Sequence, residues 1–256
     1  MMPSIRHTTV TRCGPENCQP GTDELAVEEP LEIRLDGHPV AVVMRTPCHD
    51  EELVAGFLVT EGIVSAVSHI RKIEARPEEN RVLVFLHDHV RTDLGRLTRH
   101  IFSASSCGLC GKTTLDAVFT HATPLASRPT IPDAALLAAP GQLRAAQTVF
   151  ESTGGLHAAG IFSLSGQLLI SREDVGRHNA VDKVIGHALL QDIDLSSTFL
   201  LVSGRLSFEI LQKSLVARIP AVAGISAPSS LAVDFARESG QELIGFLRPP
   251  TFNRYS

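Results

Sequence analysis

Residues 198–248 read TFLLVSGRLSFEILQKSLVARIPAVAGISAPSSLAVDFARESGQELIGFLR. This stretch contains three short apolar runs, TFLLV, AVAGI and ELIGFL, which are typical of buried strands. Between them lie SFEILQKSLVAR and SSLAVDFARES, whose apolar residues recur with helical spacing. Strands that alternate with helices at this interval predict a parallel sheet with right-handed crossovers. We therefore expect an α/β fold with a mostly parallel sheet flanked by helices.

The residues upstream extend the same core. HNAVDKVIGHALL (178–190) has one apolar helical face, and LHAAGIFSLSGQLLISRED (156–174) predicts a hairpin that turns at Ser165-Gly166. Residues 123–155 predict two short helices, the second ended by Gly154-Gly155. KTTLDAVFTHA (112–122) also has a helical pattern.

The N-terminal third predicts a smaller unit. LEIRLDGHPVAVVMRTP (31–47) indicates a hairpin with Asp36-Gly37 at its turn, and a helix follows in residues 49–63 with Asp50 as its cap. Two further strands flank a turn at residues 77–80. We expect a flexible tail over residues 1–29, a small α+β domain over 30–98 and the α/β domain over 99–256.

Composition limits the functions that are open to the chain. The net charge of −5 and the pI near 6.1 argue against broad binding of nucleic acid. No run approaches the roughly 18 apolar residues of a membrane span, and the N-terminus has no apolar core of a secretion signal. Five cysteines, without the spacing of a disulfide framework, favour the reducing cytoplasm.

Four segments follow predicted strands and lead into helices or the C-terminus: VSGRLS (202–207), ISAPSS (225–230), FLRPPTFN (246–253) and SREDVGRHNAVDK (171–183). Ligands of open parallel sheets bind beyond the carboxyl ends of the strands, where helix N-termini favour anions. Arg205 and Arg248 are suited to phosphate. The segments predict a phosphorylated ligand such as a nucleotide, although neither G-x-G-x-x-G nor a P-loop is present.

SSCGLCGK (105–112) places two of the five cysteines close together. Zinc, a redox dithiol and a sulfur-carrying thiol all use this spacing. Zinc is disfavoured because the other close pair, Cys13 and Cys18, lies in the predicted tail, and Ala159 in LHAAG replaces the glutamate of a zinc deaminase. Gly108 and Gly111 fit a flexible arm better than a helix. The residues alone leave the dithiol and the sulfur carrier open.

SSCGLCGK, TGGLHAAGIF, EDVGRHNAVDKVIG, SGRLSFEI and GFLRPPTFNRYS together resemble the formate dehydrogenase accessory sulfurtransferase family, FdhD. The resemblance runs from about residue 30 to the end and implies a cytoplasmic homodimer with a cytidine-deaminase-like core that lacks the deaminase zinc site. It also implies a function: the protein takes persulfide sulfur from a cysteine desulfurase. It delivers this sulfur to the molybdenum bis(molybdopterin guanine dinucleotide) cofactor of formate dehydrogenase.

The resemblance also implies site residues. Cys107 is expected to bear the persulfide, with Cys110 as its partner, and no metal is expected. The cofactor, or GDP as its mimic, is expected at Phe246, Leu247, Arg248, Pro249, Pro250 and Thr251, with Gly204, Arg205, Arg177 and His178 nearby. Cys48 and Pro249-Pro250 depart from the family pattern. The alternatives are a non-catalytic chaperone that binds the cofactor and a zinc-stabilised binding module.

Overall fold

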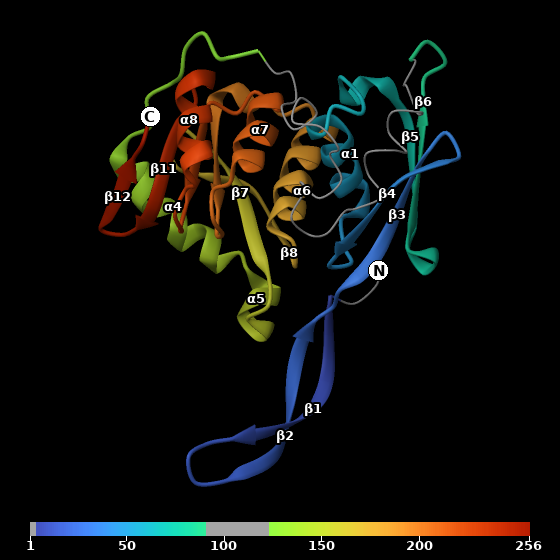
Figure 1. Ribbon diagram of the computed structural model, residues 1–256, viewed down its shortest axis with the longest axis vertical. Coiled ribbons are helices and arrows are strands. Elements are labelled where there is room, and N and C mark those ends of the chain that lie inside the picture. The colour runs from blue at the N-terminus through green and yellow to red at the C-terminus, as the bar shows by residue number, and fades with distance from the viewer. Residues whose placement is uncertain (1–3, 91–122) are drawn as a thin grey trace.

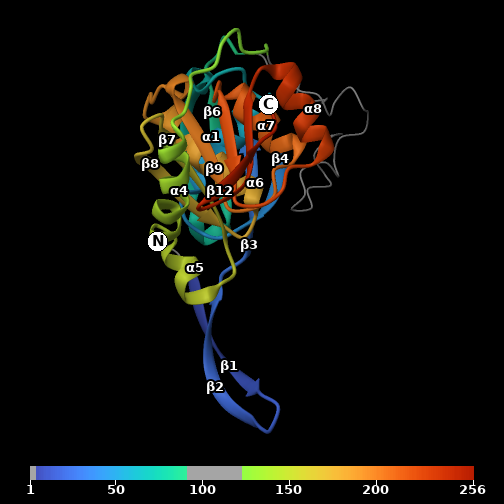
Figure 2. The same ribbon diagram turned by 90° about the vertical axis from the view of Figure 1, so that its left-hand side faces the viewer.

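The computed structural model describes residues 4–90 and 123–256. Two sheets lie on either side of a layer of helices (Figure 1). Further helices cover the outer face of the larger sheet, and a long hairpin projects away from the body (Figures 1 and 2).

The larger sheet has six strands in the order β12-β11-β10-β9-β7-β8. Its strands are β7 (His157–Ser163), β8 (Leu168–Asp174), β9 (Thr198–Val202), β10 (Ala221–Gly224), β11 (Glu242–Arg248) and β12 (Thr251–Arg254). β9, β10 and β11 are parallel, as predicted, whereas β7, β8 and β12 pair antiparallel with their neighbours. The α/β class is confirmed, but this sheet is mixed rather than mostly parallel, because both of its edges are built from hairpins.

Helices cover both faces of the larger sheet. α6 (Arg177–Leu190), α7 (Phe208–Val216) and α8 (Ser230–Ser239) pack on one face around Val181, Leu200 and Val222. α4 (Asp133–Ala145) lies on the other face with Phe162 and Phe199, followed by α5 (Thr148–Thr153). α5 ends at Gly154 with a φ of 65°, which confirms the predicted glycine stop. These apolar clusters hold the sheet rigidly between its helices.

The smaller sheet has the order β4-β3-β6-β5 and carries α1 (Asp50–Thr60) on its inner face. Its strands are β3 (Glu29–Leu35), β4 (His38–Arg45), β5 (Ile70–Arg76) and β6 (Arg81–Leu86), with short 3-10 helices at Val67–His69 and Pro77–Glu79 and a third at Leu195–Ser197. The predicted turn at Asp36-Gly37 is confirmed, with positive φ at both residues. The expected capping role of Asp50 is wrong: its carboxylate binds the buried Arg45 guanidinium at 2.9 Å instead.

The N-terminal segment differs from the expected flexible tail. β1 (Ile5–Cys13) and β2 (Cys18–Ala26) form an antiparallel hairpin whose last pair, Cys13 and Cys18, is joined by a disulfide. The hairpin extends away from both sheets (Figure 1). The predicted boundary at residues 98 and 99, and the predicted helix over 112–122, lie outside the described residues. Among the helices that are described, none is long and apolar enough to cross a membrane.

Glu52 of α1 connects the two parts of the molecule. Arg172 in β8 donates two hydrogen bonds to its carboxylate, at 2.6 and 2.7 Å, and His187 Nδ1 lies 2.9 Å from Oε1. Burial acts to raise the pKa of Glu52, but the hydrogen bonds from Arg172 and His187 outweigh it and lower the pKa. Its ion pair therefore adds stability above the ordinary carboxyl pKa, and this contribution is lost as the pH falls through the lowered value.

Glu52→Gln is expected to lower the free energy of unfolding at pH 7 by about 1–2 kcal/mol. The difference from the wild type should shrink on acidification, because the wild-type carboxylate is protonated while the amide does not titrate. Urea unfolding at pH 7 and pH 3 measures both values. Glu51→Gln, at the exposed neighbouring position, is the control and should behave as the wild type. A gap that stays constant with pH would contradict the assignment.

Candidate functional site at the carboxyl edge of the larger sheet

The loops predicted to share one edge are brought together there. Leu206 forms a bridge with Pro228, and its N–H donates to Ala227 at 3.0 Å, so the loops after β9 and β10 lie side by side. Phe246 N–H donates to Ser226 at 3.1 Å and joins the end of β11 to them. α6, α7 and α8 all begin at this edge, so their unpaired N–H groups create a positive potential there.

Three buried polar atoms at this edge have no hydrogen-bond partner among the described residues: Arg177 Nε, His178 Nδ1 and Glu209 Oε1. His178 is 6% exposed and Glu209 is 9% exposed. Buried polar atoms are almost always paired, because leaving one unpaired costs about 1–3 kcal/mol. Unpaired atoms gathered at one place are a typical sign of a site that is completed by a ligand.

Glu209 and Ser207 also belong to this edge, although the sequence pattern does not mark them as site residues. His178 Nε2 lies 3.2 Å from Glu209 Oε2 and 3.4 Å from Ser207 Oγ, and the Ser207 hydroxyl donates to Glu209 at 3.0 Å. Burial acts to raise the pKa of Glu209, but the His178 hydrogen bond and the nearby Arg177 charge lower it overall. An ionised glutamate therefore orients the His178 imidazole at the start of α6.

Gly204 lies between His157 and Arg177. A methyl group at this glycine would lie 3.3 Å from His157 Nδ1 and 3.4 Å from Arg177 Cδ, in close contact with both side chains. Burial, followed by the charges of Arg177 and His178, lowers the pKa of His157. The imidazole is thus neutral near pH 7 and offers one donor and one acceptor.

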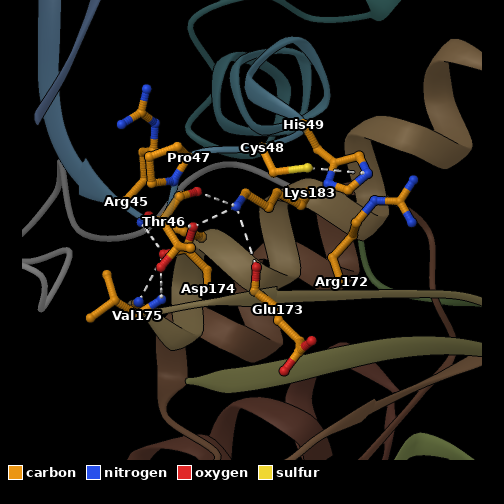
Figure 3. A network of polar contacts seen from close by, with 12 residues as sticks. Arg45, Thr46, Pro47, Cys48, His49, Arg172, Glu173, Asp174, Val175 and Lys183 are labelled. Carbon is orange, nitrogen blue, oxygen red and sulfur yellow. Dashed lines mark hydrogen bonds and ion pairs between the residues drawn. The ribbon is translucent and has the colours of Figure 1, made fainter. Parts of the chain in front are cut away.

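A buried ion pair holds the turn that precedes α6. Lys183 Nζ lies 2.7 Å from Asp174 Oδ2 and donates to Thr46 O at 3.0 Å, while Thr46 Oγ1 accepts from Val175 N–H at 3.2 Å (Figure 3). The other oxygen of Asp174 accepts from Gly176 N–H at 2.8 Å. Lys183 and Asp174 therefore position Arg177 and His178 but do not face the edge themselves.

Leu247 is buried, whereas the other remaining predicted contact residues are exposed. Arg205 and Arg248 are exposed, and Arg248 Nε donates to Ile225 O at 2.9 Å, which ties it to the edge loops. Phe246 is 40% exposed, with Arg248 stacked over its ring. Leu247 is instead fully buried in the core. Pro249 and Pro250 form the turn between β11 and β12, in which Arg248 pairs with Thr251, so this segment is a hairpin and not an open loop.

The five cysteines are in three different situations. Cys107 and Cys110 lie outside the described residues. Cys48 is half-buried, with Sγ 3.7 Å from His49 Nε2 (Figure 3), and burial raises the pKa of its thiol. Cys13 and Cys18, which were weighed as zinc ligands, are bonded to each other. Within residues 4–90 and 123–256, no three histidine, cysteine or acidic side chains gather in a metal-binding arrangement.

A profile of the FdhD/NarQ family matches residues 26–256 of this chain. This chain belongs to the FdhD/NarQ family. The match covers both sheets and all the edge loops described above.

Relatives that are about 50% identical to this chain are named "Sulfur carrier protein FdhD". The protein of Mycolicibacterium paratuberculosis is 50% identical over 264 residues, which is 99% of this chain and 96% of that protein. The protein of Streptomyces coelicolor is also 50% identical, over 91% of this chain and 87% of its own length. The crystal structure of a formate dehydrogenase accessory protein from Desulfotalea psychrophila superposes with a TM-score of 0.82 at 26% identity, covering 99% of this chain and 98% of that one. These likenesses support a role in sulfur transfer.

Proposed function

We propose that this protein accepts persulfide sulfur from a cysteine desulfurase on Cys107. It delivers the sulfur to the molybdenum bis(molybdopterin guanine dinucleotide) cofactor that formate dehydrogenase requires. We propose further that it works as a homodimer in the cytoplasm. Cys110 is the partner thiol, and guanine nucleotides such as GDP act as mimics of the bound cofactor.

The observation that carries the proposal is the unsatisfied, cation-rich edge of the larger sheet. This edge contains three helix N-termini and three arginines, Arg177, Arg205 and Arg248. His178 and Glu209 each add one unpaired buried atom. A guanine dinucleotide presents pyrophosphate to the helix termini and arginines. The names of the 50%-identical relatives support the sulfur-carrying part.

The sulfur steps balance with a cellular dithiol as the two-electron reductant. The Cys107 thiolate attacks the outer sulfur of the donor persulfide, a new S–S bond forms on Cys107, and the desulfurase thiolate leaves. Delivery requires that the carried sulfur gain two electrons and leave as sulfide. Attack by the Cys110 thiolate on the Cys107 sulfur supplies them and leaves a Cys107–Cys110 disulfide, which a cellular dithiol then reduces.

Mass spectrometry after incubation with a cysteine desulfurase and cysteine tests the acceptor. The peptide that contains Cys107 is expected to gain one sulfur atom, and Cys107→Ser should lose this gain together with its support of formate dehydrogenase activity in a strain without its own carrier. Cys48→Ser is the matched control: its half-buried thiol has a raised pKa, so little of it is the reactive thiolate, and the variant should behave as the wild type.

The same strain distinguishes the rival functions. If the protein were a chaperone that only binds the cofactor, the double variant Cys107→Ser, Cys110→Ser would still support full formate dehydrogenase activity. The double variant Arg205→Ala, Arg248→Ala would lose this support. A zinc-stabilised module predicts stoichiometric zinc in the purified protein. Either result would overturn the sulfur-carrier proposal.

A further inference from the structure

The hairpin of β1 and β2 carries a cysteine pair at its exposed end. Its base is held against the body: Val27 N–H donates to Ser4 O, and the Ser4 hydroxyl donates to Pro47 O, both at 2.9 Å. The tip, where Cys13 and Cys18 are bonded to each other, is the part of the hairpin that lies furthest from both sheets (Figures 1 and 2).

The position of this disulfide argues against a structural role in the body of the protein. It joins two residues that are five positions apart and that face each other as the last pair of the β1–β2 ladder. A bridge that closes so short a loop restricts only the tip, because it connects no elements that are distant in the sequence. All but the last residue of the hairpin precedes residue 26, where the match to the family begins.

Both cysteines are open to attack by a thiol. Every residue from 11 to 20 is exposed, and thiol–disulfide exchange requires that a thiolate reach one of the two sulfur atoms. A groove of about 350 Å³ lies beside Cys13 and is lined by Arg12, Asn17 and Gln19 among others. These side chains present hydrogen-bond donors to the backbone carbonyls of a docked polypeptide.

Little besides the disulfide keeps the tip closed. None of residues 5–26 is buried, and the ion pair of Arg12 with Asp23, at 3.9 Å, is exposed to solvent. An isolated two-stranded ribbon is marginally stable at best in water. Reduction of the Cys13–Cys18 bond should therefore loosen the end of the hairpin and leave the two sheets unchanged.

We propose that Cys13 and Cys18 form a reversible thiol–disulfide exchange site, which reacts with a protein dithiol docked at the hairpin tip. The inference goes beyond the proposed function and uses only the cytoplasmic location that it includes, because cytoplasmic disulfides are usually transient and take part in redox chemistry.

The exchange takes place in two steps. A thiolate of the partner attacks one sulfur atom of the pair, the Cys13–Cys18 bond breaks, and the other cysteine leaves as a thiolate that takes up a proton. The partner's second thiolate then attacks the mixed disulfide. The partner ends as a disulfide, and the hairpin, which has gained two electrons, holds two thiols.

A thioredoxin whose second active-site cysteine is replaced by serine tests the site, because it traps the mixed disulfide. The oxidised full-length protein is expected to form this covalent complex without denaturant. The double variant Cys13→Ser, Cys18→Ser should lose the complex, whereas the double variant Cys107→Ser, Cys110→Ser should still form it. Circular dichroism verifies that both variants fold.

Tryptic peptides identify the cysteine that reacts. Cleavage after arginine and lysine places Cys13 and Cys18 in the peptide 13–34, whereas Cys107 and Cys110 lie in the peptide 100–112. Mass spectrometry should therefore find the thioredoxin attached to peptide 13–34. In the native protein, reduction should also speed the cleavage after Arg12 at the loosened tip.

Arg12→Ala tests the docking at the groove. It should slow formation of the complex about 5-fold, the effect of one net hydrogen bond. Arg6→Ala is the matched control, because Arg6 is exposed on the same strand but lies near its base. Equal rates for the two variants would overturn the docking of the partner at the tip.

Three further results would overturn the exchange site: no thioredoxin on peptide 13–34, reduction of the pair only after unfolding in urea, or a lower urea midpoint for Cys13→Ser, Cys18→Ser than for the wild type. Each of them leaves the proposed function intact, because none involves sulfur on Cys107. If Cys107 gains no sulfur from a desulfurase while the complex forms on the hairpin, the proposed function fails and the exchange site stands.

Discussion

Gly186→Ala is expected to lower the free energy of unfolding by about 3 kcal/mol, near the upper end for overpacking of a close contact. α1 and α6 cross with their backbones in contact, and a methyl group on Gly186 would overlap the carbonyl of Glu52. On α1, a methyl group on Gly56 would overlap the carbonyl of Asp182 in the same way. Neither helix can give way alone, because each is packed into its own sheet's core.

The matched control is Gly141→Ala in α4. Nothing lies within 4 Å of the added methyl group there. This change should raise stability by about 0.5–1 kcal/mol, since alanine is the better helix former. The midpoint of urea unfolding measures both variants. If Gly186→Ala stabilised the protein as Gly141→Ala does, the close crossing of α1 and α6 would be disproved.

The elements that could be predicted from the sequence are those that bury an apolar face or run. Apolar periodicity marked α6, α7 and the strands β9 to β11, because each of these segments buries one continuous apolar face or run. β12 has only four residues after two prolines and gives no such signal. β1 and β2 project from the body, so no apolar face distinguishes them, and their polar residues were interpreted as a tail.

The candidate site was predictable in place but not in all of its members. Glycine, serine and arginine after each strand identified the edge, because the carboxyl ends of parallel strands meet there. Glu209 resembles an ordinary acid in the first turn of a helix, and only the fold places it beside His178. The charged run 171–183 predicts a binding segment, yet several of its residues have structural partners. Arg172 binds Glu52, 120 positions away, and Asp174 accepts from Thr46 N–H, 128 positions away. Lys183 pairs with Asp174 within the buried turn.

The helices α1, α6 and α7 meet at a second buried charge cluster. Lys213 Nζ of α7 lies 2.9 Å from Asp182 Oδ2 of α6 and 2.7 Å from Glu61 Oε1, which follows α1. Thr60 Oγ1 donates to Asp182 Oδ1 at 2.7 Å and accepts from Lys213 at 2.9 Å. Burial alone would lower the pKa of Lys213, but the carboxylates of Asp182 and Glu61 outweigh it and raise the pKa. Lys213 is therefore charged in the folded protein.

Lys213→Met is expected to cost about 3–5 kcal/mol, because it leaves the buried carboxylate of Asp182 without its cation. Adding Asp182→Asn to this variant should recover part of the loss, because the amide carries no charge to desolvate. The cost should also shrink as the pH falls, as for Glu52→Gln but for a different reason. Without Lys213, burial holds the pKa of Asp182 above its unfolded value, so protonation at low pH removes the unpaired charge from the folded state.

Lys72→Met is the matched control for the loss of a lysine–glutamate contact. Lys72 and Glu74 are 2.8 Å apart, as close as the buried pair, but the Lys72 side chain is 60% exposed. Solvent screens such a pair, so this variant should leave the urea midpoint unchanged. Equal losses from Lys72→Met and Lys213→Met would show that burial does not determine the cost. A Lys213→Met deficit that grew on acidification would show that the Asp182 carboxylate is not what destabilises the variant.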